Sequence, residues 1–320
     1  MTDSRQDADR DRPVVFIDGE AGTVGLSIRH RLAGVPALRV VSIRPDLRKE
    51  VDARLECYRQ ADVAVLCLPD PAAKEIVARV AELGAEAPKI LDASTAHRVD
   101  SGWVFGFPEL DAAQPAAIAR AAKVTNPGCY ATGTIALLRP LLEARIVPSD
   151  YPITINAVSG YTGGGSSLIA DYESGKAPAF KLYALELRHE HLGEIQAYSG
   201  LARPPIFVPS VANYRQGMLI SIPLHLETLP GKPASQDLAD VLSRRYAKTE
   251  RIRFIPPSDL ESRSELEPEA LNHTDALELR IFAREDHRHA VLVARLDNLG
   301  MGAAGTAIQN LFLMTGCTAT

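Results

Sequence analysis

The feature that most constrains the fold of this chain is the alternation of short apolar runs with helical segments over residues 14–92. The apolar runs are bounded by Gly, Pro or Asp and lie at residues 14–18, 38–43, 63–68 and 90–92. Helical periodicity occupies residues 23–32 and 72–83 between them. Such runs are typical of strands buried on both faces of a parallel sheet. We therefore predict an α/β, Rossmann-type, doubly wound parallel sheet.

The second part of the chain has a different pattern. An Ala-rich stretch leads into a helical segment at residues 127–144, after which strand-like runs dominate, at residues 153–159, 206–209, 219–226, 277–282 and 290–296. Their partial period-two alternation is typical of a sheet with one open face. This predicts an α+β second domain with a mixed or antiparallel sheet. Residues 302–314 return to helical spacing, and we expect this C-terminal helix to pack back onto the first domain.

Composition and charge exclude several classes of protein. The 320 residues have a formal net charge of −5, so no global positive field attracts nucleic acid or an anionic membrane. No run approaches the roughly 18 consecutive apolar residues of a membrane span, and the charged N-terminus is unlike a signal peptide. The four cysteines show no CxxC spacing, which disfavours a disulfide framework or a zinc site. We expect a cytoplasmic protein that binds neither nucleic acid, membrane nor metal.

A glycine-rich turn lies between the first predicted strand and the helix that follows. It contains Gly19, Gly22 and Gly25, with Thr23 and Val24 at the start of the helix. Small residues let the backbone approach a pyrophosphate, and the helix N-terminus supplies N–H groups and a positive dipole end. The turn predicts a dinucleotide site, although any tight strand-to-helix turn can hold three glycines.

The end of the second predicted strand indicates which dinucleotide binds. Dehydrogenases that prefer NAD usually have Asp or Glu there for the ribose hydroxyls, whereas this chain has Ser42 and Arg44. A hydroxyl and a guanidinium suit a 2′-phosphate. We therefore expect NADP(H), while the nearby Asp46 keeps NAD(H) as an alternative.

The candidate nucleophile is Cys129, at the start of the helical segment. With Asn126 as N-cap and Pro127 at the first helical position, Cys129 would be the third helical residue, among free amide donors. Helix N-termini lower the pKa of a cysteine, and the thiolate is the nucleophile. The alternative role, a small buried apolar residue, is expected for the other cysteines, Cys57, Cys67 and Cys317.

The segment RHEHLGE, residues 188–194, is the most polar constellation of the second part. His189 and His191 are two residues apart and point in different directions on a helix, which excludes a single helical metal face. If a helix begins near Leu192, however, His191 and Glu194 share a face, and the carboxylate can fix the tautomer of an imidazole acid/base. The alternative is a solvated, charged helix start. A second His pair, at residues 287–289, is expected at an exposed start of a strand.

Two further segments are candidate anion sites. In residues 159–167, Ser159, Gly160 and Gly163 belong to a run that can form either a backbone nest or a flexible turn. Residues 92–98 follow a strand at the sheet edge where ligands gather. There we expect Ser94 to contact the cofactor and Arg98 to hold a substrate oxyanion, unless Arg98 is an ordinary surface arginine.

Together these motifs resemble those of the N-acetyl-γ-glutamyl-phosphate reductases of the shorter type, in the semialdehyde dehydrogenase superfamily. The resemblance runs from residue 14 to the C-terminus and rests on the order of its motifs: DASTAHR at 92–98, FGFPEL at 105–110, NPGCY at 126–130, the glycine run, HEH at 189–191, QGM at 216–218 and NLG at 298–300. It implies an enzyme of arginine biosynthesis that reduces an acyl phosphate to an aldehyde with NADPH.

The resemblance also implies site residues. The family's nucleophile corresponds to Cys129, its histidine motif to His189 and His191, and its C-terminal cofactor contacts to Asn298 and Gly300. The substrate candidates are then Arg98, Asn126, Ser159, Gly160 and Gly163. This chain departs from the expected pattern at Ser166-Ser167, Gly193 and Met301, where a basic residue, Pro and Lys are expected.

These patterns predict the organisation of the chain. Residues 1–12 are expected to be a disordered tail, residues 13–112 with 299–320 an NADP-binding domain, and residues 113–298 a catalytic, substrate-binding and oligomerisation domain. A homo-oligomer, a dimer or a tetramer, is expected because open sheets often pair. Three other functions remain open: an aspartate-semialdehyde dehydrogenase, a non-catalytic NADP-binding sensor or scaffold, and a cofactor-free thiol hydrolase.

Overall fold

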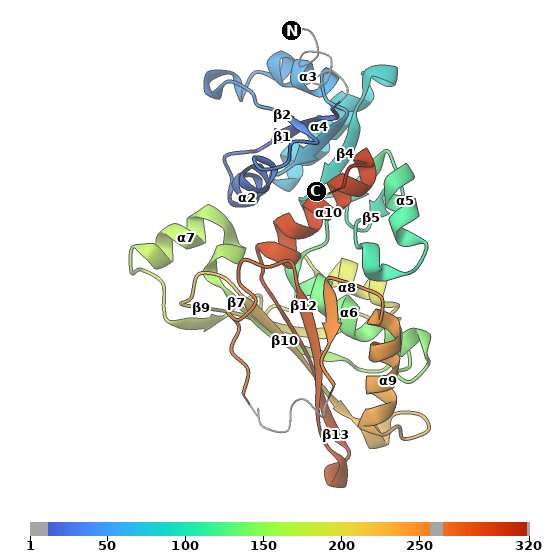
Figure 1. Cartoon of the computed structure of the whole chain (residues 1–320). Helices are drawn as coiled ribbons and strands as arrows, with labels where there is room; N and C mark the ends of the chain where they lie inside the picture. The colour runs from blue at the N-terminus through green and yellow to red at the C-terminus, as the bar shows by residue number, and fades with distance from the viewer. Residues whose placement is uncertain (1–11, 257–264, 319–320) are drawn as a thin grey trace. The chain divides into compact units, whose positions relative to one another are not determined.

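The computed structural model describes residues 12–256 and 265–318, which form two compact units. The first unit consists of residues 12–126 and 306–318, and the second of residues 127–256 and 265–305 (Figure 1). The predicted N-terminal tail lies, apart from Arg12, outside the described residues. Among the helices of the described ranges, none has both the length and the apolarity needed to cross a lipid bilayer.

The first unit is built on a six-stranded sheet with the order β2-β1-β3-β4-β6-β5. Its strands are β1 (Val14–Asp18), β2 (Arg39–Val41), β3 (Val63–Leu66), β4 (Lys89–Asp92), β5 (Val104–Phe105) and β6 (Lys123–Thr125). Every pairing is parallel, and all five residues of β1 are buried. This confirms the parallel sheet that the continuous apolar runs predicted.

The connections place helices on both faces of this sheet. They are α2 (Thr23–Leu32), α3 (Val51–Arg59), α4 (Asp70–Ala81) and α5 (Gln114–Arg120). From β1 the chain steps outward to β2 and then crosses back over β1 to β3. Because such crossovers are right-handed, the change of direction puts α2 and α3 on opposite faces. The carboxyl ends of β1 and β3 are therefore the switch point where ligands bind in such sheets.

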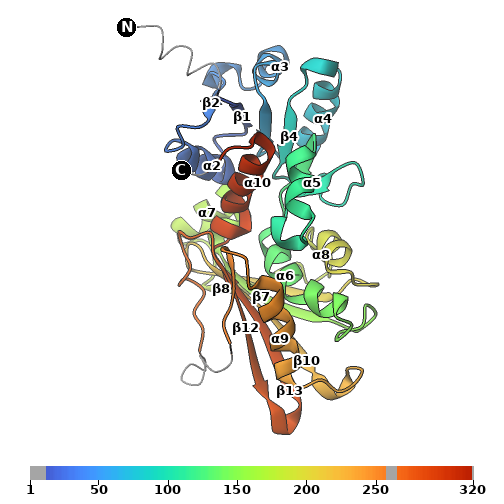
Figure 2. The ribbon, with the colours of Figure 1, turned by 45° about the vertical axis from the view of Figure 1, so that its right-hand side comes forward.

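The C-terminal helix α10 (Gly305–Thr315) packs onto the first unit, as predicted. Figures 1 and 2 both show it beside α5. On β4, Lys89 Nζ donates to the carbonyl of Met314 at 2.9 Å, and Gln309 Nε2 donates to Glu109 at 2.8 Å. These bonds join segments that are far apart in the sequence.

The boundary between the units differs from the one expected at residue 113. Strand β6 pairs in parallel with β4 and β5, so residues 113–126 belong to the first sheet. At the other end, residues 299–305 belong to the second unit. The pairing of β6, a strand of only three residues, decides the boundary, and the Ala-rich sequence before it carries no sign of that pairing.

The second unit contains a seven-stranded sheet with the order β11-β12-β13-β10-β7-β9-β8. Its strands are β7 (Thr154–Gly160), β8 (Phe180–Leu182), β9 (Ile206–Ala212), β10 (Met218–His225), β11 (Ile252–Phe254), β12 (Leu277–Arg284) and β13 (His289–Leu296). Two pairings, β7 with β9 and β11 with β12, are parallel and the others antiparallel. The mixed sheet is therefore confirmed, and Figure 2 shows β10, β12 and β13 side by side.

Helix α6 (Cys129–Glu143) packs directly on this sheet, between α8 (Leu192–Ser199) and α9 (Ser235–Tyr246). Alternate residues of β10, including Ile220, are buried. A Cβ on Gly133 of α6 would lie 2.5 Å from Cδ1 of Ile220, so the glycine permits the close approach of helix and sheet. The remaining helix, α7 (Gly165–Glu173), follows β7, and a π-helical turn, Gly300–Ala304, follows β13.

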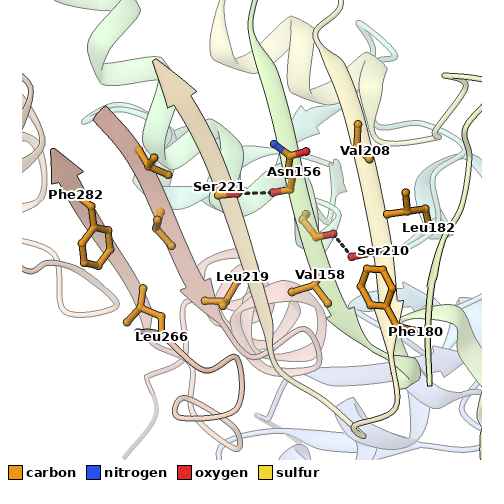
Figure 3. A pocket seen from close by; sticks show the side chains of 13 residues that line it. Asn156, Val158, Phe180, Leu182, Val208, Ser210, Leu219, Ser221, Leu266 and Phe282 are labelled. Carbon is orange, nitrogen blue, oxygen red and sulfur yellow. Dashed lines mark hydrogen bonds between the residues drawn. The ribbon is translucent and has the colours of Figure 1, made fainter. Parts of the chain in front are cut away.

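The sheet of the second unit also carries an open apolar groove of about 580 Å³ (Figure 3). Val158, Leu219, Phe180 and Leu182 are among the side chains that line it, and the last two are 54% and 48% exposed. Phe180 and Leu182 both belong to the edge strand β8, and contiguous exposed apolar surface of this kind marks an interaction surface.

Candidate functional site

The glycine turn after β1 requires glycine at two of its three positions. Gly19 has φ +90°, and a Cβ there would lie 2.3 Å from the carbonyl oxygen of Cys67, at the end of β3. A Cβ on Gly25 would lie 2.4 Å from the oxygen of Gly19, whereas one on Gly22 makes only an ordinary contact of 3.5 Å. Gly22 is the N-cap of α2, whose first residue is Thr23. The N-terminus of α2 therefore lies at the switch point, where a pyrophosphate fits.

The predicted phosphate ligands at the end of β2 already have partners within the chain. Ser42 Oγ donates to Glu20 Oε2 at 2.7 Å. Arg44 forms two hydrogen bonds with Asp46, at 2.7 and 3.2 Å. Glu20, a buried carboxylate between two glycines of the turn, was not predicted as a site residue, although a charged residue inside a glycine-rich turn is itself a signal.

Residues 92–98 form a buried, hydrogen-bonded loop rather than an exposed one. Asp92 is fully buried and accepts bonds from the N–H and hydroxyl of Ser94, both at 2.9 Å, and it contacts His97 Nδ1 at 2.7 Å. His97 in turn stacks on Trp103, with 4.4 Å between ring centroids. Ser94 thus lies at the carboxyl end of β4 with its hydroxyl directed to Asp92.

Arg98 is buried as well, in contrast to an ordinary surface arginine. Its Nε donates to the backbone carbonyl of Asn126 at 3.1 Å. The side chain of Asn126 accepts a bond from Asn310 Nδ2 of α10, at 3.2 Å. The substrate candidates Arg98 and Asn126 are thus in contact, and α10 helps to hold them.

In the second unit, α6 begins at Cys129 itself, with Gly128 as N-cap. The expected N-cap Asn126 and first helical residue Pro127 both precede the helix, so Cys129 is the first helical residue and not the third. The extended backbone of Gly128 (φ −76°, ψ 153°) moves the helix start. Its N–H donates to the buried carboxylate of Glu194, on α8, at 3.1 Å. Cys129 remains within the first turn, where helical N–H groups lack intrahelical acceptors.

The π-helical turn after β13 approaches the cysteine closely. A Cβ on Gly302 would lie 2.7 Å from Cβ of Cys129, so this position must be glycine if the two backbones are to keep their separation. Single π-helical turns occur frequently at functional sites. The sequence showed only a helical pattern here, and the irregular turn was not predicted.

The two histidines lie together beside Tyr130, the residue after the cysteine. Helix α8 begins at Leu192, as expected, with the buried His191 as its N-cap. The rings of His189 and His191 are 4.7 Å apart, and that of Tyr130 lies 5.7 Å from each. Within the constellation, His191 and Glu194 are buried and His189 is partly buried, whereas Arg188, Glu190 and Gly193 are exposed.

A chain of hydrogen bonds determines the tautomer of His189. The N–H of His191 donates to Nδ1 of His189 at 3.1 Å, so the neutral ring carries its proton on Nε2. That nitrogen lies 3.4 Å from the hydroxyl of Tyr183, which donates to Tyr130, which donates to the carbonyl of Ser210. Burial raises the pKa of both tyrosines, so neither ionises near neutral pH. Tyr130 and Tyr183 were not predicted as site residues.

The glycine run and the predicted C-terminal cofactor contacts form one cluster in the second unit. Asn298 is buried, its Oδ1 accepts a bond from the N–H of Gly217, and its Nδ2 donates to Thr162 within the run. A Cβ on Gly163 would lie 3.2 Å from Ser159 Oγ and 3.7 Å from Asn298 Nδ2. The amide of Asn298 thus fixes the run.

The two remaining glycines of this cluster are required by their neighbours. A Cβ on Gly160 would lie 2.7 Å from the backbone of Gln216, and one on Gly300 would lie 2.0 Å from the carbonyl of Thr274. The start of the run is therefore packed against Gln216, whereas Gly163 and Gly164 are exposed.

The predicted site residues divide between the units. The first unit holds Gly19, Gly22, Thr23, Val24, Gly25, Ser42, Arg44, Ser94, Arg98 and Asn126, and the second holds Cys129, Ser159, Gly160, Gly163, His189, His191, Glu194, Asn298 and Gly300. The second His pair, at 287–289, is exposed at the start of β13, as expected. Within residues 12–256 and 265–318, no group of three or more His, Cys, Asp or Glu side chains is arranged to hold a metal ion.

Most of the chain is similar to proteins of known families. A family model described as "Semialdehyde dehydrogenase, NAD binding domain" matches residues 19–119, and one described as "Semialdehyde dehydrogenase, dimerisation domain" matches residues 129–298. The chain is 46% identical to "N-acetyl-gamma-glutamyl-phosphate reductase 2" of Pseudomonas putida, over 95% of this chain and 97% of that protein.

Solved structures share the fold at low sequence identity. Aspartate semialdehyde dehydrogenase II of Vibrio cholerae, complexed with ASA, has a TM-score of 0.73 at 15% identity and covers 95% of this chain and 98% of its own. Aspartate semialdehyde dehydrogenase of Candida albicans, with NADP, has a TM-score of 0.64 at 14% identity with the same coverage.

Proposed function

Because the chain belongs to the semialdehyde dehydrogenase family, among the N-acetyl-γ-glutamyl-phosphate reductases, we propose that it reduces N-acetyl-L-glutamyl 5-phosphate to N-acetyl-L-glutamate 5-semialdehyde and phosphate in arginine biosynthesis. The reductant is NADPH. The observation that carries this proposal is Cys129 at the first position of α6, between Gly128, which donates to Glu194, and Tyr130, whose ring lies beside those of His189 and His191.

Cys129 is the nucleophile of the proposed reaction. Its thiolate attacks the γ-acyl carbon, a tetrahedral intermediate forms, and phosphate leaves with the electron pair of the broken C–O bond, so a thioester remains on the enzyme. The amide groups of the first turn of α6 stabilise both the thiolate and the oxyanion. Glu194 supports this turn by accepting the N–H of Gly128.

His191 is the acid/base of the proposed reaction, and His189 positions it. Nδ1 of His189 accepts the backbone N–H of His191, and its Nε2 faces Tyr183, so both nitrogens of His189 already have partners. His191 donates a proton to the oxygen of the acyl carbon when the thiohemiacetal forms, and it accepts that proton back when the thiohemiacetal collapses to the aldehyde and the Cys129 thiolate leaves. In the proposed mechanism, the carboxylate of Glu194 orients the ring of His191.

NADP(H) is the proposed cofactor. The glycine turn, the N-terminus of α2 and Thr23 and Val24 at its start would hold the pyrophosphate, and Ser42 and Arg44 follow β2, beside which the adenosine ribose lies in such sheets. Ser94, Asn298 and Gly300 complete the proposed cofactor contacts. When bound, the reduced nicotinamide supplies the hydride that converts the thioester to the aldehyde.

The proposed substrate contacts are Arg98 and Asn126 from the first unit and Ser159, Gly160 and Gly163 from the second. A buried guanidinium suits a carboxylate or phosphate oxygen, since its planar donors match both. Ser166-Ser167, which replaces an expected basic residue, follows the glycine run directly and begins α7 with Gly165.

The first unit, with α10, is proposed as the cofactor domain and the second as the catalytic and oligomerisation domain of a cytoplasmic enzyme. The second unit matches a dimerisation domain, so a homo-oligomer is expected. The apolar groove of Figure 3 is the proposed contact surface, because burying Phe180 and Leu182 against a second copy removes exposed apolar area from water. The molar mass in solution, measured by light scattering, distinguishes a dimer from a tetramer.

The test runs the reaction in reverse. N-acetylglutamate semialdehyde, phosphate and NADP⁺ are supplied, and the absorbance of the reduced cofactor is followed. We expect phosphate-dependent reduction that disappears in Cys129→Ser. Activity on aspartate semialdehyde in place of the acetylated substrate would favour an aspartate-semialdehyde dehydrogenase. A chain that binds NADP but reduces it with neither aldehyde would contradict the proposal and favour a sensor or scaffold.

A further inference from the structure

A buried carboxylate inside the glycine turn collects three donors from different elements. Glu20 is 4% exposed, its oxygens accept hydrogen bonds from Ser42 at 2.7 Å and from Arg48 at 3.1 Å, and it forms an ion pair with Arg29 at 3.2 Å. Ser42 directly follows β2, Arg48 follows the short 3-10 turn Pro45–Leu47, and Arg29 lies on α2. Glu20 therefore ties the glycine turn to the end of β2 and to the helix that follows the turn.

The position of this cluster in the sheet is informative. In doubly wound sheets a dinucleotide lies with its pyrophosphate on the first strand-to-helix turn and its adenosine ribose beside the end of the next strand. Glu20 belongs to the first of these places and Ser42 to the second. The side chains that meet at Glu20 thus come from the segments between which the adenosine ribose lies in such sheets.

The cluster of Glu20, Arg29 and Arg48 carries a net positive charge, and the charged groups that solvent reaches are its guanidinium groups. One carboxylate faces two guanidinium groups, which leaves an excess of one positive charge. The carboxylate is buried, whereas the side chains of Arg29 and Arg48 are 48% and 39% exposed. A guanidinium has five N–H donors, and its ion pair with Glu20 occupies only part of them.

The donors predicted from the sequence are less suited to an additional phosphate. Arg44 pairs in bidentate fashion with Asp46, which neutralises its charge locally. Ser42 already directs its only proton to Glu20. The accessible excess charge therefore belongs to Arg29 and Arg48.

We propose that Arg29 and Arg48, held in place by Glu20, bind the 2′-phosphate of the dinucleotide and determine the preference for NADP(H) over NAD(H). This inference rests on the proposed NADP(H) dependence and assigns that preference to residues other than Arg44. A ribose without the phosphate offers these guanidiniums only hydroxyl groups, so its binding depends little on them. Glu20 acts as a positioning residue.

The test measures binding without turnover. Isothermal titration calorimetry gives the Kd of 2′,5′-ADP and of 5′-ADP for the full chain, and the ratio of the two reports the 2′-phosphate alone. We expect Arg48→Gln and Arg29→Gln each to lower the preference for 2′,5′-ADP by about tenfold, as for loss of one charge-assisted bond, with the Kd of 5′-ADP changed less than about twofold. Because each ratio is taken within one variant, a partly unfolded preparation does not distort it.

Two control variants sharpen the result. Arg44→Gln should lower the preference by less than about threefold, since its charge is already paired. Arg79→Gln, an exposed arginine on α4 paired with Glu82, should leave the preference unchanged. Glu20→Ala should lower the preference in the same direction as the arginine variants, because it releases both guanidiniums. A rise in that variant would contradict the positioning role.

The outcomes separate this inference from the proposed cofactor. If the wild-type chain binds 2′,5′-ADP and 5′-ADP equally, the NADP(H) dependence itself fails, and the inference fails with it. If the wild-type chain prefers 2′,5′-ADP but the Arg29 and Arg48 variants keep that preference, only the inference is overturned. The same holds if the whole loss occurs in Arg44→Gln.

Discussion

In the first unit the candidate cofactor site consists largely of one continuous stretch of backbone, residues 19–25, whereas the second unit assembles its candidate catalytic site from side chains far apart in the sequence. Gly128 and Glu194, which meet in a hydrogen bond, are 66 residues apart. A turn built from backbone needs only glycine at defined positions. A site built from side chains depends on how helices and strands pack.

The two regions also differ in the surroundings of their cysteines. Cys67 lies beside the glycine turn, and its backbone carbonyl is close to Gly19. Burial raises the pKa of its thiol to about 12, and the nearby carboxylates of Asp92 and Asp18 contribute to the rise. Cys129 opens a helix, a position that favours thiolate. One cysteine thus supports a turn, and the other is the proposed nucleophile.

The largest effect is expected from Cys129→Ser. Removing the thiol should lower turnover by at least about 10³-fold, because a serine hydroxyl is a far weaker nucleophile than a thiolate. Binding of NADP⁺, followed by calorimetry, should stay unchanged, since the first unit contains the proposed dinucleotide turn. Near-normal turnover in this variant would contradict the role of Cys129 as the nucleophile and the assignment of catalysis to the second unit.

The second prediction compares the two histidines. His191→Asn should lower kcat by about 10²-fold or more, the usual contribution of a general acid or base. His189→Asn should have a smaller effect, because its role is to support the backbone of His191. Steady-state kinetics across pH 6–9 checks this. A larger loss in His189→Asn would reverse the two assignments.

The third prediction addresses the backbone-built turn. Gly19→Ala should destabilise the fold by about 3 kcal/mol and weaken NADP⁺ binding, since alanine is strained at φ +90° and its Cβ would overlap the Cys67 carbonyl. Gly22→Ala is the matched control and should cost less than about 1 kcal/mol. Urea denaturation measures both. Equal losses would mean that the turn tolerates no side chain anywhere.

The smallest effect concerns the thiol of Cys67. Because the pKa of Cys67 is raised to about 12, the fraction of thiolate at pH 8 is negligible, and iodoacetamide should leave Cys67 unmodified in the folded chain. Burial also raises the pKa of Cys57. Peptide mass mapping after brief alkylation should therefore show modification of Cys129 before either of these. Early labelling of Cys67 would indicate that the turn opens readily.

Local patterns predicted the main elements well. Strand β1 and helix α2 have the expected bounds, residues 14–18 and 23–32, since apolar runs and glycine punctuation are local properties. Helix α9, at residues 235–246, and helix α3, at 51–59, were not predicted. Both helices are rich in charged residues and have few apolar positions. Only once the chain is packed is it clear that these positions face a sheet.

The sequence by itself determined the fold class and the glycine turn, and it led to Cys129 as the proposed nucleophile, because each depends on residue types at fixed short spacing. Only the tertiary structure decided that α6 begins at Cys129, that β6 belongs to the first sheet, and that Glu20 gathers Ser42 and two arginines. These features arise from contacts between segments remote in the sequence. Their free energy depends on burial and hydrogen-bond geometry, which exist only once the chain is packed.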